Sequence, residues 1–313
     1  MRCDLHVHSR CSGPVNLPVL RRFGRECYSE PHAVYEQARR RGMDLVTLTD
    51  HDTIEGGLEI AALPATFVSV ELTCELPSGH ELHLGVWGIA PRRHARLQAL
   101  RGDAEALFAY LAEQRLPACV NHPFSALTGR REIADLHLAL RHLDLVEATN
   151  SMMPAHTNAY ARRAGEEAGL AAVGGSDAHT LGSVAHAWTE VEGARSVEDF
   201  LEGLRRGFSL PRGSSGSYAR LTRDVVAVFA GGYRENAQLA PRSRQHALRL
   251  AVMVSALPIL AFIPVVTALI YAQERAFARR TWRAFHASER PARRRPFFAP
   301  PPLGGGMALE AGR

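Results

Sequence analysis

The sequence predicts an α/β protein whose parallel sheet closes into a barrel. Short apolar runs that end in polar residues alternate with amphipathic stretches over residues 3–179, and strands alternating with helices are typical of parallel α/β folds. Nearly every run ends in His, Asp or Glu. The strand ends of a barrel converge on one mouth, where active sites form, whereas an open sheet would spread them along a line. Closure is therefore the favoured arrangement.

Seven strands can be counted, one fewer than an eight-stranded barrel has. A helix is expected between most of them, and in the stretch 103–115 the side chains of Leu107, Phe108 and Leu111 fall on one stripe behind Asp103, a suitable N-cap. The other expected helices are 31–42, 132–142 and 157–169. The expected strands are 3–8, 44–52, 66–71, 81–88, 117–122, 143–150 and 170–179.

Charge divides the chain into unequal parts. Residues 1–219 hold 22 arginines against 27 acids, while residues 220–313 hold 15 arginines against 5 acids. Such asymmetry is typical of a tail for membrane or nucleic acid on a separate body, and the Gly/Ser-rich run PRGSSGSYARL marks a boundary. We expect a barrel over 1–210, a linker and basic helix over 211–247, a hydrophobic segment over 248–273, and a basic, Pro/Gly-rich tail over 274–313 whose end, residues 291–313, is disordered.

Residues 250–272 carry no charge and are long enough to span a bilayer. A spanning or inserted segment is the first interpretation, and a core helix of the front domain is the alternative. Pro258 and Pro264 would each kink or break such a helix, because proline removes a backbone donor. Arginines flank both ends, so a re-entrant hairpin or an in-plane helix competes with a simple span.

Cysteine usage bears on the compartment. The five cysteines are an odd number without a CxxC pair, and no cleavable apolar segment follows Met1. Neither a disulfide framework nor secretion is indicated. We expect a cytoplasmic protein, attached to the inner face of the membrane if residues 250–272 insert; the sequence does not indicate its oligomeric state.

The first chemical motif is DLHVHS at residues 4–9. Alternate residues of a strand face the same side, so His6 and His8 present both imidazoles to one point, as a chelate would. Two barrel-interior histidines bonded to backbone are the alternative.

The next motifs are TDHDT and a lone acid. Asp50, His51 and Asp52 close an apolar strand, where burial as unpaired charges would be costly; a turn with a solvated Asp is the alternative. Glu71 closes the following strand and is suited to bridging two cations. The alternative is an ordinary solvated acid at a strand end.

Three further segments supply weaker signals. His83 and His122 each stand at the end of an expected strand, and the motif GGSDAH offers Asp177 and His179 behind two glycines that allow close backbone approach. Imidazole combined with carboxylate suits Zn, Mn or Fe rather than Ca or Mg.

The order DLHVHS, TDHDT, Glu71, His83, NHPF and SDAH resembles the PHP (polymerase and histidinol phosphatase) family of metal-dependent phosphoesterases over roughly residues 2–190. The resemblance implies a distorted (β/α)7 TIM-like barrel that binds two or three divalent ions, with Asp50 and Asp52 orienting imidazoles. It assigns His6, His8, Glu71 and Asp177 to the first ion, Glu71, His83 and His122 to the second, and His51 and His179 to the third.

One stretch departs from the family pattern. The family usually supplies a further His or Asp soon after the HxH pair, but residues 10–16 read RCSGPVN. The third site would be weak, absent, or completed by Cys11, Asn16 or the more distant Glu26. For Cys11 a packed thiol is the favoured interpretation.

The implied activity is hydrolysis of a small phosphorylated substrate. Two ions sharing Glu71 would activate a bridging water as the nucleophile. Arg10, Arg130 and Arg131 follow ligand-bearing strands and could hold a phosphate, unless they are ordinary surface arginines.

Two other functions stay open. One is a metal-binding regulatory or scaffold module whose basic tail lies on a membrane. The other is a nuclease acting on nucleic-acid ends. The excess of acids in residues 1–219 argues against a nucleic-acid partner, because such affinity rests largely on neutralising phosphates.

Overall fold

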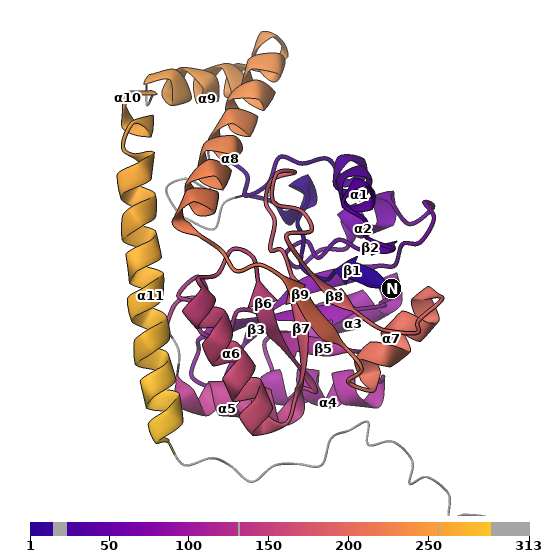
Figure 1. The fold of residues 1–313 in the computed structure, drawn as a ribbon. Coiled ribbons are helices and arrows are strands. Elements are labelled where there is room, and N and C mark those ends of the chain that lie inside the picture. The colour runs from indigo at the N-terminus through magenta and orange to yellow at the C-terminus, as the bar shows by residue number, and fades with distance from the viewer. Residues whose placement is uncertain (15–23, 131, 256, 289–313) are drawn as a thin grey trace, which may run out of the picture.

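The computed structural model describes residues 1–14, 24–130, 132–255 and 257–288. Two sheets lie at the centre of the body, with helices on the outside (Figure 1). The four-stranded sheet has the order β2–β1–β8–β9, with β1 (Arg2–Asp4), β2 (Leu45–Val46), β8 (Ala187–Glu190) and β9 (Leu210–Gly213). The five-stranded sheet has the order β3–β4–β5–β6–β7, with β3 (Ser69–Glu75), β4 (Glu81–Trp87), β5 (Ala118–Val120), β6 (Leu145–Asn150) and β7 (Ala171–Gly175).

The α/β class is confirmed, but the prediction of one closed parallel barrel is wrong in two respects. Among the described residues, the backbone pairing between the sheets consists of isolated parallel bridges, Val46 to Thr66 and His51 to Glu71 at one seam and Val7 to Ala178 at the other, and side-chain bonds such as those of Thr189 Oγ1 with Gly174 add to it. In addition, β4 runs antiparallel to both β3 and β5. Strand direction cannot be read from an apolar run, because alternation is the same in either direction.

The antiparallel β4 still delivers its histidine to the expected rim. His83 pairs with Thr73 near the carboxyl end of β3, since the start of an antiparallel strand lies beside the end of its neighbour. The prediction that His83 stands at the end of its strand is therefore wrong, because His83 lies near the start of β4.

Helices cover the sheets on their outer sides. Apolar side chains of the five-stranded sheet, including Val86, Val120 and Val146, form one core with Leu107 and Phe108. A second core lies between the sheets and contains the fully buried Trp87. The helices of the body are α1 (Pro31–Arg40), α2 (Glu55–Glu59), α3 (Pro91–Leu100), α4 (Ala104–Glu113), α5 (Ile133–His142), α6 (Ala155–Ala168) and α7 (Val197–Arg205), with a 3-10 turn, η1 (Arg10–Ser12).

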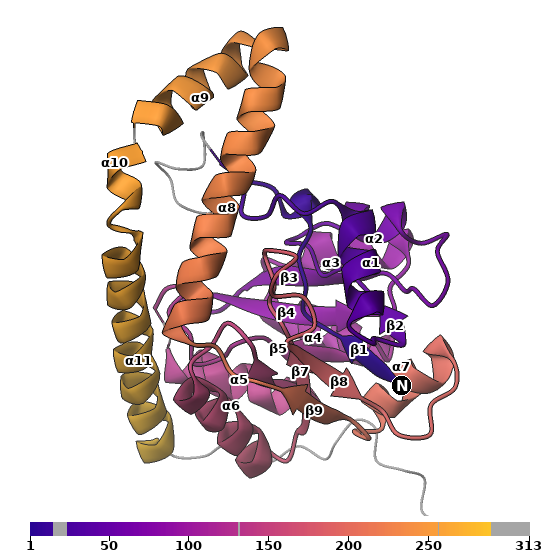
Figure 2. The same cartoon turned by 45° about the horizontal axis from the view of Figure 1, so that its top comes forward.

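The C-terminal helices stand along one side of the body, and we call residues 218–288 the C-terminal arm (Figures 1 and 2). Within it, α11 runs beside α6 and α5, and its Ala278 and Phe285 belong to the main core. The arm comprises α8 (Tyr218–Leu239), the 3-10 turn η2 (Ala240–Arg242), α9 (Arg244–Ser255), α10 (Leu257–Leu260) and α11 (Ile263–Ala287).

The apolar run 250–272, for which a membrane-crossing or inserted segment was predicted, is divided over α9, α10 and α11. Pro258 and Pro264 lie at the first turns of α10 and α11, which agrees with the expectation that each proline interrupts a helix. Among the described residues, no helix combines the length and the apolar character needed to cross a bilayer.

The expected linker takes ordered structure. Residues 210–213 form β9, and the Gly216 N–H donates to the Met153 carbonyl at 2.7 Å. Ser217 then caps α8 by accepting from the Arg220 N–H. Much of the predicted tail, residues 289–313, lies outside the described residues, and the division into four parts stays a prediction.

Candidate metal centre

His6 and His8 follow β1 directly, and their rings lie with centroids 5.1 Å apart. Both residues are 1% exposed. Gly175 of β7 makes this packing possible, because a Cβ on it would lie 2.3 Å from the His6 Cβ and 2.6 Å from the His6 nitrogen. The glycine therefore has the role predicted for it, close approach of two backbones.

Glu71 lies at the centre of the cluster. It is fully buried in β3, and its two oxygens face different imidazoles. Oε1 is 3.2 Å from His6 Nε2, His83 Nδ1 and His122 Nε2. Oε2 is 3.3 Å from His8 Nε2 and 3.1 Å from His51 Nδ1.

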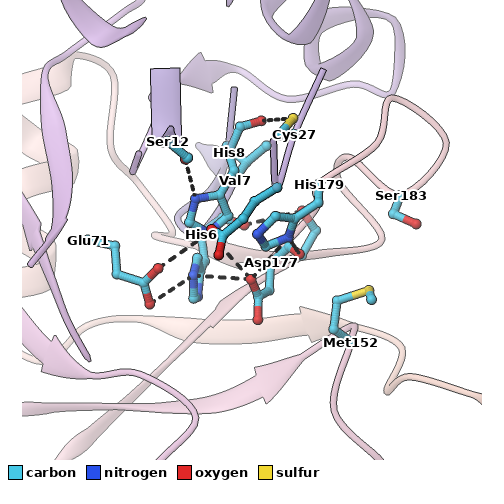
Figure 3. A network of polar contacts seen from close by, with 12 residues as sticks. His6, Val7, His8, Ser12, Cys27, Glu71, Met152, Asp177, His179 and Ser183 are labelled. Carbon is cyan, nitrogen blue, oxygen red and sulfur yellow. Dashed lines mark hydrogen bonds and ion pairs between the residues drawn. The ribbon is translucent and has the colours of Figure 1, made fainter. Parts of the chain in front are cut away.

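Asp177 closes the opposite side of the His6 and His8 pair (Figure 3). Its Oδ1 lies 3.4 Å from Nε2 of both His6 and His8. The residue has a positive φ of 53°, as do His122 at 29° and Asp52 at 55°. Non-glycine residues in this region are strained, and such strain gathers at functional sites.

The most exposed members of the cluster lie on one side. The His179 ring stacks on His8 at 4.3 Å between centroids, and the His51 ring does so at 4.6 Å. His51 Nε2 is 3.1 Å from Glu26 Oε2. Of the three residues offered as a completion of the third site, Glu26 is the one in contact with His51; Cys11 Sγ lies 3.7 Å from Glu59 Oε1 instead, and Asn16 is outside the described residues.

These donors fit divalent metal ions. Donor atoms about 2.1 Å from one ion lie roughly 3.0–3.4 Å apart, which matches the nitrogen-to-oxygen distances around Glu71 and Asp177. Buried atoms with no hydrogen-bond partner include Nε2 of His6 and of His8, Oε2 of Glu71 and Nδ1 of His83; such buried atoms require a partner. Four overlapping groups have donors close enough for one ion, namely His6–His8–Glu71, His6–His122–Asp177, His51–Glu71–His83 and His8–His51–His179.

The grouping differs in part from the family-based assignment. His51 lies with Glu71 and His83 as well as with His179, and His122 lies with His6 and Asp177. All eight predicted ligands nevertheless come together in one cluster. Their assignment to individual ions stays a prediction.

A set of hydrogen-bonding partners fixes the imidazoles from outside. His6 Nδ1 lies 2.8 Å from Glu147 Oε1, and His8 Nδ1 lies 3.0 Å from the Ser12 hydroxyl. Ser12 in turn donates to Asp50 Oδ1 at 2.8 Å. These contacts orient each ring so that its Nε2 faces inward.

Asp50 therefore acts on His8 through Ser12, in line with the predicted orienting role. Asp52 differs, since its carboxylate accepts from the Thr73 N–H at 2.8 Å and pairs with Arg101 at 2.8 Å. Its visible contacts fix the loop rather than an imidazole.

The buried acids and imidazoles of the cluster shift one another's pKa values. Burial would raise the pKa of Glu71, but the imidazoles of His6, His83 and His51 hold that pKa well below its usual range. Burial and repulsion from His179 and His51 lower the pKa of His8 to about 3. A neutral His8 keeps its lone pair available as a ligand.

Of the three arginines proposed to hold phosphate, Arg10 and Arg130 lie at the periphery of the cluster and Arg131 is outside the described residues. Arg10 pairs with Glu30 at 2.5 Å and with Glu235 at 3.3 Å. Arg130 is exposed in the loop after β5, and Arg131 lies outside the described residues. Their role stays a prediction.

Sequence reasoning missed several residues of the cluster. Glu147 accepts from the His122 N–H at 2.8 Å besides contacting His6, and Asn121 donates to Glu71 Oε1 at 2.9 Å. An acid inside the apolar run 143–150 was an available signal for Glu147, and the Asn of NHPF was one for Asn121.

The C-terminal arm bonds to loops that carry candidate ligands. Asp224 accepts from Thr180 at 2.8 Å and from Ser183 at 2.6 Å, just after His179. Glu274 accepts from the Ser125 hydroxyl at 3.0 Å, in the loop after His122. The arm thus contributes to the rim of the site.

An α/β body with six imidazoles around buried carboxylates defines the class as a candidate multinuclear metalloprotein. Residues 155–208 match the family model described as PHP-associated. The match includes SDAH at residues 176–179, one of the motifs on which the predicted resemblance to the PHP family rests.

Individual relatives are distant. An uncharacterized protein of Methanocaldococcus jannaschii, MJ1587, is 36% identical over 67 residues, which is 21% of this chain and 38% of that protein. PsfC from Pseudomonas syringae PB-5123 shares the fold with a TM-score of 0.52 at 18% identity, over 74% of this chain and 97% of PsfC. A two-domain protein of Bacteroides vulgatus containing a predicted PHP-like metal-dependent phosphoesterase has a TM-score of 0.48 at 17% sequence identity. The match covers 73% of this chain and 69% of that protein.

Proposed function

We propose that the protein hydrolyses a phosphate ester with the help of two or three divalent metal ions. The observation that carries the proposal is the position of Glu71, whose two oxygens face separate groups of imidazoles. A carboxylate in this position can bridge two ions. Ions held there would lower the pKa of a coordinated water and neutralise charge on phosphoryl oxygens. The donor set favours Zn, Mn or Fe.

The residues of the chain would hold and orient this centre. Glu147 and Ser12 fix the rings of His6 and His8 with Nε2 inward, and burial excludes bulk water from Glu71. In our proposal the two sheets, joined by isolated bridges at both seams, serve as the distorted barrel of the family.

Exposure within the cluster suggests the side from which substrate enters. The side chains of His51 and His179 are 22% and 24% exposed, against 0% for His8 and Glu71. We infer that a small phosphorylated molecule approaches over His51 and His179, with its phosphoryl group toward Glu71. This gradient does not distinguish monoesters from diesters.

The test is turnover by the full chain loaded with Mn or Zn, using a chromogenic phosphate ester. We expect metal-dependent hydrolysis that a chelator abolishes. His8→Ala should reduce turnover by at least about 100-fold, because it removes a buried donor. His32→Ala, at an exposed position of α1, is the matched control and should retain activity. Unchanged turnover in His8→Ala would refute the site, and bound metal without activity on mono- and diesters would favour the scaffold alternative.

A further inference from the structure

Helix α11 carries two stripes of side chains rather than one. The inward stripe includes the buried Ile263, Ala278 and Phe285. A second stripe begins with Phe262 and Leu269, which are 59% and 65% exposed. Its apolar members Phe262, Val265, Val266 and Leu269 recur every three or four residues and therefore share one face of the helix.

The outward face changes character along the helix. Continuing at the same spacing from Leu269, it passes Gln273 and Ala276 and reaches Arg280 and Arg283, both exposed. The outward face thus combines an apolar first half with a cationic second half, and both kinds of side chain bind membrane surfaces.

The whole C-terminal arm concentrates exposed apolar surface. In the described part of the chain, 17 large hydrophobic side chains are exposed, and 13 of them lie within residues 218–288. Single exposed apolar residues are ordinary, but their concentration on one element is typical of an interaction surface.

Charge on the arm is segregated. Residues 218–288 contain three acids, and all three bond to the body. Asp224 accepts from Thr180 and Ser183, Glu235 pairs with Arg10, and Glu274 accepts from Ser125. The same range holds ten arginines. The outer side therefore presents cations beside apolar side chains, with the acids turned inward. The exposed arginines are Arg223, Arg234, Arg242, Arg244, Arg275, Arg279, Arg280 and Arg283.

We propose that the C-terminal arm binds in the plane of a bilayer that contains anionic lipid, with the outward face of α11 at the interface. The lipid tails would cover the apolar stripe, and the headgroups would neutralise the arginines. A second copy docked through this face would bring arginines against arginines without acids to offset them. Pro258 and Pro264 divide the apolar run into segments that can lie along a surface.

The experiment is flotation of the full chain with two kinds of vesicle. One kind is pure phosphatidylcholine, and the other contains one quarter phosphatidylglycerol. We expect binding to the anionic vesicles and little to the neutral ones, and a loss of binding at high salt. Equal binding to both, or none to either, would overturn the proposal.

Matched variants locate the surface. Phe262→Gln should weaken flotation, whereas Phe208→Gln on the body should not, although both phenylalanines are 59% exposed. The pair Arg280→Gln and Arg283→Gln should weaken binding about 25-fold, at about fivefold per arginine. The exposed arginines 92 and 96 of α3, changed in the same way, serve as controls.

Two outcomes would assign the surface otherwise. Variants of the arm that float like their controls would show that the face of α11 is not used. Concentration-dependent self-association that Phe262→Gln abolishes, without vesicle binding, would assign the face to a second copy. Turnover of a soluble ester is measured in parallel, so failure of this proposal is distinguishable from failure of the catalytic one.

Discussion

Replacing Glu147 by glutamine tests how the centre is oriented. The carboxylate is 2% exposed and receives bonds at both oxygens, from His6 Nδ1 on one and from the His122 N–H and Asn150 amide on the other. Glutamine offers one acceptor and one donor group. If its oxygen serves His122 and Asn150, its NH2 group faces His6 Nδ1, and His6 must then carry its proton on Nε2.

That change of tautomer removes the inward lone pair of His6 while leaving the bonds in place. The opposite orientation of the amide would oppose donors to the His122 N–H and to Asn150, so the first is preferred. We expect metal affinity to fall by about 10–100-fold. The free energy of unfolding of the metal-free protein should fall by at most about 1–3 kcal/mol, because the bonds to His6, His122 and Asn150 keep partners and only the second N–H of the new amide gains none.

Metal content after equilibration with buffered metal measures the first quantity, and urea denaturation of the metal-free protein measures the second. Glu190→Gln, which alters an acid of β8 paired with Arg212 at the surface, is the control for loss of one negative charge. Metal affinity within twofold of that control would refute the reasoning. A loss of stability without a loss of metal affinity would show that Glu147 is simply structural.

Two further predictions concern the arm and the cysteines. Glu274→Gln should destabilise the protein by about 1–3 kcal/mol, because a buried acceptor shared by Ser125 and the Ala126 N–H is weakened. Thermal denaturation measures this loss, and an unchanged midpoint would contradict the prediction. Burial raises the pKa of Cys27 to about 12, so its thiolate is scarce at pH 8. In the native protein, alkylation should therefore modify the partly exposed Cys11 first, and Cys27 only after denaturation. Equal rates by mass spectrometry would be inconsistent with this.

The candidate ligands could be predicted because their signals are local. The spacing of His6 and His8 places both rings on one side of an extended segment, whatever surrounds it. Asp50 and Asp177 follow β2 and β7, and strand ends meet at one rim, whereas Glu71 lies within β3, which continues to Glu75. Neither inference needed knowledge of which strands are neighbours, and the structure brings His6, His8, Glu71 and Asp177 together.

Other features depend on pairing that no local pattern encodes. The antiparallel β4 looks like any other apolar run, yet its direction decides where His83 lies. Glu147 sits in the middle of β6, beside a register shift between Glu147 and Thr149, so alternation alone would not tell which way it points. Glu26 reaches His51 from 25 positions away along the chain, and only the fold brings the two together.

The basic C-terminal part illustrates the same limit in a different way. Asp224 and Glu274 look like solvated acids among arginines, but they are 4% and 7% exposed. Burying a carboxylate is costly unless donors compensate it, and here the donors come from loops next to His179 and His122. The hydroxyl donors of those loops in turn need acceptors, so the arm and the loops around the site satisfy one another's hydrogen bonds. A tail that merely carried charge would leave its acids in water, and the arm is therefore better understood as a part of the site that also presents a cationic, apolar outer face.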